Sequence, residues 1–156
     1  MSRQQFDFAK VVAVTPVVDT AIYASGDLIG GKLTLTDLCG EARTMEIVSV
    51  LLTDLAAQNS AIDIIFFNAD PTGTTFTDNA ALDIADADLT KVCAIVKLLA
   101  ANYAAFADSS AIASGGIEQI VQLSGSQDLY AALVSRGTPT YVAASDLQLK
   151  VAVQQH

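Results

Sequence analysis

The stretch Asp146-Leu147-Gln148-Leu149-Lys150-Val151-Ala152-Val153-Gln154 decides how this chain is interpreted. Leucine and valine at positions 147, 149, 151 and 153 fall on one side, and the glutamines and the lysine fall on the other. A period of two is typical of a β-strand with one buried face. The stretch therefore predicts a half-buried strand, and the rest of the sequence follows the same pattern.

Further strands are expected upstream of this one. Residues 32–36 alternate after the pair Gly30-Gly31, which suits a turn or a β-bulge. Residues 9–14 predict a strand that Pro16 ends or confines to a sheet edge. Large apolar and β-branched residues predict additional strands at residues 43–53, 62–67, 93–100, 117–123 and 129–136.

The connections between these segments indicate the fold class. Residues 43–53 and 62–67 are joined by a short segment, which suggests neighbouring antiparallel strands. One short helix is expected around residues 84–92, where an aspartate can cap the first turn, and residues 93–100 either extend it or form a strand. Because strands and helices do not alternate regularly, we expect a mainly β fold, an antiparallel β-sandwich of jelly-roll type. Residues 1–156 form one domain in this interpretation, with residues 1–8 as an N-terminal arm.

The chain is poor in charge for a soluble domain. Charged residues make up 16% of it and apolar residues 52%, with a mean hydropathy of +0.44, whereas a typical domain is about 25% charged. This deficit suggests that other protein covers part of the surface in the working state. The alternative is that many of the apolar residues are alanines, which cost little to expose.

The sign of the charge excludes some partners. The 8 basic and 17 acidic residues give a net charge of -9, which disfavours nucleic acid and anionic membrane surfaces. The sequence has no run of about 18 apolar residues and no secretory signal at its start. We therefore expect a protein made in a cytoplasm, without membrane or nucleic-acid partners.

Catalytic motifs are not evident in the sequence. The one histidine is His156, where a terminal position disfavours a fixed geometry with a nucleophile. Cys39 and Cys93 lack a CxxC spacing, so both are expected to be small buried apolar residues instead of zinc ligands or a disulfide. The two glycine pairs, at 30–31 and 115–116, match no phosphate-binding motif. We expect a protein that is not an enzyme and uses no cofactor.

Two groups of polar side chains remain to be assigned, and neither is expected to form a catalytic, cofactor or metal site. Clustered carboxylates can hold a hard cation such as calcium, but here their spacing does not match an EF-hand, which favours solvated loop and cap residues. These carboxylates belong to Asp70, Asp78, Asp83, Asp86 and Asp88. The tyrosines are expected at core edges or subunit contacts, with their hydroxyls reaching water. They are Tyr23, Tyr103, Tyr130 and Tyr141.

Three stretches together resemble a known family. They are Tyr23-Ala-Ser-Gly-Asp-Leu-Ile-Gly-Gly-Lys-Leu33, residues 73–84 (Gly-Thr-Thr-Phe-Thr-Asp-Asn-Ala-Ala-Leu-Asp-Ile) and residues 129–141 (Leu-Tyr-Ala-Ala-Leu-Val-Ser-Arg-Gly-Thr-Pro-Thr-Tyr). In this order they resemble small structural proteins of tailed bacteriophages over the whole domain. Related proteins of this size serve as capsid decoration or cement proteins, which sit on the outer shell and bridge capsomers. The resemblance carries no catalytic motif.

The resemblance implies a non-enzymatic virion protein on the capsid surface. Its partners would be the major capsid protein and further copies of itself, as a homodimer or homotrimer. A neck or tail component is the alternative within the virion. A binding module or hydrolase that uses a divalent cation at residues 70–88 is the alternative outside it. Phe6 and Phe8, which flank Asp7 in the N-terminal arm, are candidates for insertion into a neighbouring molecule.

Overall fold

Ten strands and two short helices form the part of the chain that the computed structural model describes, residues 9–155. The strands are β1 (Ala9–Val14), β2 (Leu28–Leu35), β3 (Thr44–Asp54), β4 (Ile62–Phe67), β5 (Val92–Leu98), β6 (Ala104–Ala105), β7 (Ser110–Ser114), β8 (Gln119–Gln122), β9 (Leu129–Ser135) and β10 (Leu147–Gln155). The helices are α1 (Asp86–Leu89) and the 3-10 helix η1 (Ala100–Asn102).

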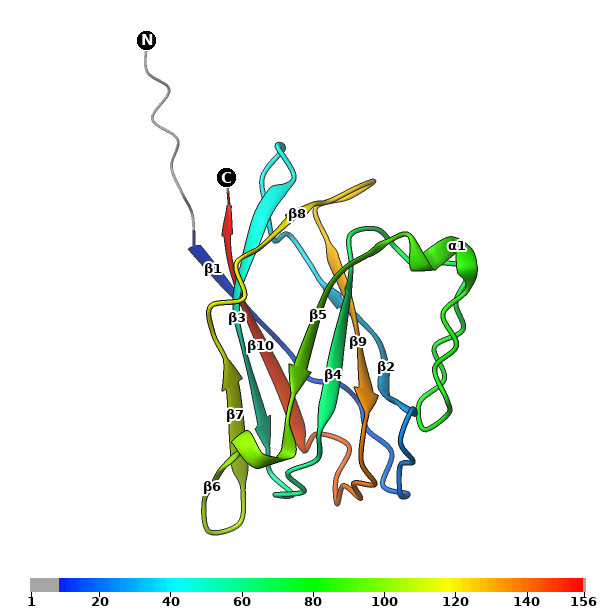
Figure 1. Ribbon diagram of the computed structural model, residues 1–156, viewed down its shortest axis with the longest axis vertical. Coiled ribbons are helices and arrows are strands. Elements are labelled where there is room, and N and C mark those ends of the chain that lie inside the picture. The colour runs from blue at the N-terminus through cyan, green and yellow to red at the C-terminus, as the bar shows by residue number, and fades with distance from the viewer. Residues whose placement is uncertain (1–8, 156) are drawn as a thin grey trace.

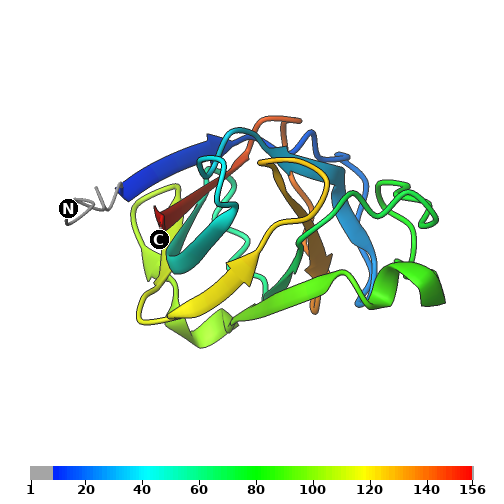
Figure 2. The same cartoon turned by 90° about the horizontal axis from the view of Figure 1, so that it is seen from above.

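The strands make two antiparallel sheets that lie face to face (Figures 1 and 2). The larger sheet has the order β1-β10-β3-β7-β6, and β8 also pairs with β3. The smaller sheet has the order β2-β9-β4-β5. The first strand thus lies beside the last, and the second lies beside the next to last. This nested order is that of a jelly roll, and the predicted β-sandwich is confirmed.

Strands β7 and β8 together cover one edge of β3. Strand β7 pairs with residues 50–54 of β3, whereas β8 pairs with residues 44–47. Between them the chain passes through Gly116 and Glu118, which both have a positive φ, at 63° and 49°. Glycine adopts such a φ without strain, which is why the pair Gly115-Gly116 interrupts the strand here.

The main core lies between the two sheets. The alternating apolar residues of β10, at positions 147, 149, 151 and 153, are all buried, at 1% exposure or less, as their alternation predicts. On β3 the alternating residues Met45 and Ile47 are fully buried in the same cluster. These two central strands therefore anchor the larger sheet.

A second, smaller core lies on the outer face of the smaller sheet. Strand β9 is buried along its whole length, and its residues Tyr130, Ala132 and Val134 belong to this second cluster. The segment that connects β4 to β5, residues 68–91, supplies Phe76, Leu82 and Ile84 to it. This segment runs along the side of the sandwich in Figure 1. It is therefore a packed layer on this face of the smaller sheet.

Several sequence-based expectations are wrong in detail. Strands β3 and β4 lie in different sheets and do not pair, because their connection crosses from one sheet to the other. The helix around residues 84–92 is only four residues long, and Ala85 occupies its N-cap instead of an aspartate. Of residues 93–100, those up to Leu98 belong to strand β5 and do not extend the helix, and η1 begins at Ala100. Pro16 follows edge strand β1. Strands β6 and β7 were not predicted.

The remaining expectations concern residues that the structure does not describe. The N-terminal arm 1–8, with Phe6 and Phe8, lies outside the described residues, and so does His156. Within residues 9–155 no helix has the length and apolar character needed to cross a membrane.

Candidate interaction surface

Four connections meet at one end of the sandwich, the lower end in Figure 1. They are residues 15–27 between β1 and β2, 55–61 between β3 and β4, 99–109 between β5 and β7, and 136–146 between β9 and β10. In a jelly roll alternate connections share an end, so this arrangement follows from the strand order. We call this surface the four-loop end.

Backbone hydrogen bonds join the first and last of these connections. The Val18 N–H donates to the Ala144 carbonyl at 3.0 Å. The Tyr23 N–H donates to the Pro139 carbonyl, also at 3.0 Å. Residues 15–27 are therefore held against residues 136–146 at two separate points.

The other two connections are tied into the same framework. The Leu55 N–H donates to the Asp146 carbonyl at 2.9 Å, and the Arg136 N–H donates to the Ala61 carbonyl at 2.8 Å. The Tyr103 hydroxyl donates to the Ser60 carbonyl at 2.7 Å. All four connections are thus linked by hydrogen bonds, so the end is preorganised.

Asp54 holds the connection between β3 and β4 in place. Its carboxylate is 1% exposed and accepts hydrogen bonds from the backbone N–H groups of Ala56 at 2.9 Å, Gln58 at 2.8 Å and Asn59 at 3.4 Å. Burial raises the pKa of this carboxyl, and the N–H donors oppose that rise. In the same way, the Asp146 carboxylate accepts from Val142 and Ala143.

Two tyrosines support this end from inside. Tyr23 and Tyr141 are both 1% exposed and meet edge to face, with ring centroids 5.8 Å apart. The Tyr23 hydroxyl donates to Asp78 at 2.8 Å and accepts from the Asp19 N–H, whereas the Tyr141 hydroxyl has no partner among the described residues. Burial raises the pKa of both phenols. The expectation that these hydroxyls reach water is therefore wrong.

Large apolar side chains gather on the outside of this framework. Of the ten that are strongly exposed among residues 9–155, six belong to the four connections. They are Val17, Ile22, Leu55, Leu99, Phe106 and Val142. The other four, Val11, Leu89, Ile95 and Ile120, lie elsewhere on the molecule. Single exposed apolar residues are common, but a group at one end indicates a contact surface.

The four-loop end also contains a hollow of about 260 Å³. Residues 58–61, Ala100 and residues 136–139 line it. At its wall Arg136 donates from Nε to an Asp63 carboxylate oxygen at 2.8 Å, which neutralises both charges. An apolar cavity of about 150 Å³ can hold a benzene ring, so this hollow has room for one large side chain.

Carboxylates are unevenly divided between the connections of the four-loop end and the remaining connections. The four-loop connections contain four, and three of these accept a backbone N–H: Asp19 from Ala21, Asp27 from Ala24, and the buried Asp146; the fourth is Asp108. The other connections, residues 36–43, 68–91 and 115–128, contain nine. They are Asp37, Glu41, Asp70, Asp78, Asp83, Asp86, Asp88, Glu118 and Asp128.

The acidic residues considered as a cation site are not brought together. Asp70 pairs with Lys32 at 2.6 Å, and Asp78 accepts from Tyr23 and from the Gly30 N–H. Asp83 and Asp86 are exposed. No group of three or more potential metal ligands occurs among residues 9–155. The carboxylates that have partners here serve as anchors of the chain.

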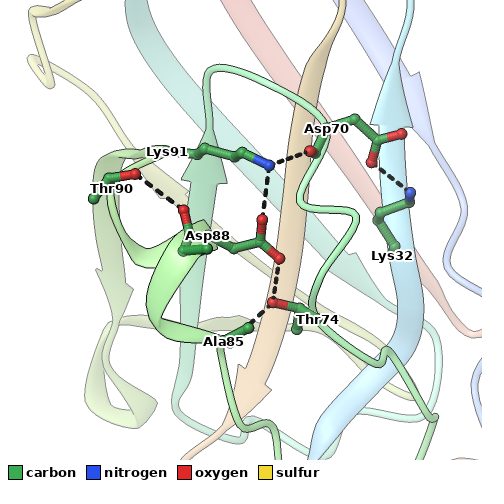
Figure 3. Close-up of polar contacts among 8 residues, drawn as sticks. Lys32, Asp70, Thr74, Ala85, Asp88, Thr90 and Lys91 are labelled. Atoms are coloured by element: carbon green, nitrogen blue, oxygen red, sulfur yellow. Dashed lines mark hydrogen bonds and ion pairs between the residues drawn. The ribbon is translucent and has the colours of Figure 1, made fainter.

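Asp88 is the main anchor of segment 68–91 (Figure 3). It is 1% exposed and pairs with Lys91 at 2.7 Å, while the Thr74 hydroxyl donates to its other oxygen at 2.8 Å. The Lys91 ammonium also donates to the Asp70 carbonyl. The Lys91 hydrogen bond lowers the pKa of Asp88, and burial partly opposes this. The Asp88 carboxylate therefore joins Thr74 to Lys91, and Lys91 extends this link to Asp70 near the start of the segment.

Replacing Asp88 with alanine should loosen segment 68–91. Lys91 and Thr74 then lose their acceptor, and we expect limited proteolysis within the segment to become severalfold faster. Because the folded pKa lies below the ordinary value of 3.8, the stabilisation is present above that pH and is lost as pH falls through the folded pKa. Asp86→Ala, at an exposed position of the same helix, is the control. Equal cleavage rates for both variants would contradict the anchor role.

Both cysteines are free thiols. Cys39 is buried in the main core and Cys93 is half-buried against it. Burial raises the pKa of the Cys93 thiol to about 12 and also raises that of Cys39. The expectation of small buried residues is confirmed for Cys39 and only partly for Cys93.

Comparisons with known proteins add little to this picture. No protein-family model matches the chain, and no curated protein matches it. Among solved structures, a family two carbohydrate esterase from Cellvibrio japonicus is 13% identical, over 94% of this chain and 33% of that chain, with a TM-score of 0.21. This chain thus spans about a third of the esterase. A similarity at this TM-score supports no inference about fold or activity.

The four-loop end could not be assembled from the sequence. Its six exposed apolar residues come from four segments that are far apart along the chain. A signal existed in residues 55–61, which contain no charged residue, and in residues 99–109, which contain only one. Only the strand order reveals that these segments share one end.

Proposed function

We propose that this protein is a non-enzymatic structural component of a tailed-bacteriophage virion. Its role would be that of a head decoration protein, which binds the outer capsid surface and stabilises the shell through protein contacts. The observation that carries the proposal is the set of ten large apolar side chains that are strongly exposed among residues 9–155, six at the hydrogen-bonded four-loop end and four on other faces. Such a surface suits binding to protein more than it suits chemistry on a small substrate.

Three further observations support the same role. The charge-poor composition suits a surface that other protein covers. The jelly roll is a fold used by viral capsid domains, although it also serves other functions. Three stretches along the chain resemble small phage structural proteins. Repetition over a capsid lattice would then turn modest single contacts into firm attachment.

Binding to capsids that lack the protein is the test. Purified protein is mixed with such capsids from its phage, the particles are sedimented, and the bound copies are counted. We expect saturation at a number set by the lattice, with one or a few copies for each capsomer. A handful of copies would contradict head decoration and favour a neck or tail position, and no binding would contradict a head role altogether.

A further inference from the structure

The four-loop end presents both an exposed aromatic side chain and a hollow that is large enough to hold one. Phe106 lies between β6 and β7, in the hairpin at the lower tip of Figure 1, and its side chain is 63% exposed. The hollow between residues 58–61 and 136–139 opens on the same end of the molecule. A surface that binds its own copy must be self-complementary, and a knob and a hollow on one surface meet that requirement.

We propose that copies of this chain bind one another through their four-loop ends. Phe106 and Val142, the latter 81% exposed, are the apolar anchors of the contact, and the hollow receives an anchor from the neighbouring copy. Aromatic anchors in desolvated pockets are where interfaces concentrate their binding free energy. The partner of this surface is therefore a second copy of the same chain.

Charge favours a second copy at this end over any other face. Two copies that each carry a charge of -9 repel, so they associate only where few unpaired charges meet. At the four-loop end Arg136 and Asp63 neutralise each other, and Asp54 and Asp146 are buried against backbone N–H groups. The exposed carboxylates of its four connections are Asp19 and Asp108, whereas the other connections expose five: Asp37, Glu41, Asp83, Asp86 and Glu118. Those faces would oppose a like partner more strongly.

The four-loop end is also large enough and rigid enough to form an interface between two copies. A stable interface buries about 800 Å² on each partner, close to a tenth of a small protein's surface. The accessible surface here is 7879 Å², so one end of the sandwich is sufficient. Because the four connections are already fixed to one another by hydrogen bonds, association requires little further ordering of the backbone.

Self-association does not depend on the capsid role, and a different experiment tests each of these two proposals. Association is measured on the free protein by sedimentation equilibrium over micromolar to millimolar concentrations. Phe106→Asp and Val142→Asp place a charge in the contact, and Ala100→Phe fills the hollow from its wall. We expect the wild type to associate and each variant to associate at least tenfold more weakly.

Matched controls carry the same change outside the four-loop end. Ile95→Asp on β5 and Val11→Asp on β1 replace apolar residues of similar exposure, 57% and 64%. Circular dichroism and thermal melting confirm that each variant is folded. We expect both controls to associate like the wild type.

Several results would overturn the proposal. One is a wild-type protein that stays monomeric at all concentrations. Another is association that none of the three four-loop variants weakens. A third is association that the two control substitutions weaken as much as the four-loop variants do. A monomer whose Phe106→Asp variant loses capsid binding would also overturn it, and would assign this end to the shell.

Discussion

Gly30→Ala should lower the free energy of unfolding by about 3–4 kcal/mol. Gly30 has a φ of +74° at the point where the pairing of β2 with β9 shifts register. A methyl group there would overlap the Pro16 ring and lie 3.1 Å from its Cα and 3.2 Å from the Val17 nitrogen. Pro16 is buried, so the backbone must move to relieve the contact. Urea denaturation measures the loss.

The neighbouring glycine provides a matched control. Gly31 has nearly the same φ, +73°, but open space where its Cβ would stand. Gly31→Ala should therefore lower the free energy of unfolding by only about 1–2 kcal/mol, the penalty for an alanine with left-handed backbone angles. Equal losses for the two variants would show that the contact with Pro16 contributes nothing.

Asp54→Ala should lower the free energy of unfolding by about 3 kcal/mol or more, because three backbone N–H groups lose their acceptor. Asp27→Ala is the control, since the Asp27 carboxylate accepts one backbone N–H, that of Ala24. Its expected cost is about 1 kcal/mol. Urea denaturation of both variants would measure the difference, and similar losses would contradict the role assigned to Asp54.

The same residue predicts a pH effect of defined sign. The pKa of Asp54 is raised above its ordinary 3.8, so the folded protein keeps a proton that the unfolded chain releases first. The contribution of this carboxyl to stability is therefore full below pH 3.8 and falls as pH rises towards the folded pKa. Asp54→Asn does not titrate there. The wild type should lose stability relative to Asp54→Asn as pH rises through this window.

The sequence located most strands through alternation or through their β-branched and large apolar residues. Residues 147–153 and 32–36 show the alternation directly, whereas residues 9–14 and 62–67 are marked by valine, isoleucine and phenylalanine. Strand β7 lacks such a signal, since Ile112 is its one large apolar residue. Its extended form depends on pairing with β3, which no local pattern reports.

The pairing of strands was beyond local sequence. The short connection after β3 suggested a hairpin, but β4 pairs with β5 and β9 instead. Ile65 and Phe67 lie on the outer face of β4 and are buried because Phe76 and Leu82, from the connection that follows, fold back over them. The burial of both faces is thus a tertiary effect. The four-loop end could not be predicted for the same reason, because its parts meet only after the sheets form.

The nested strand order also determines when the protein can fold. Strand β10 lies between β1 and β3, and β9 lies between β2 and β4. Each sheet thus needs, between two earlier strands, one of the last two strands of the described chain. A ribosome releases the chain from its N-terminus, so neither sheet can be completed until residues 129–155 have emerged. Such non-local pairing closes slowly, so each sheet gains its full hydrogen bonding only after β9 and β10 have paired.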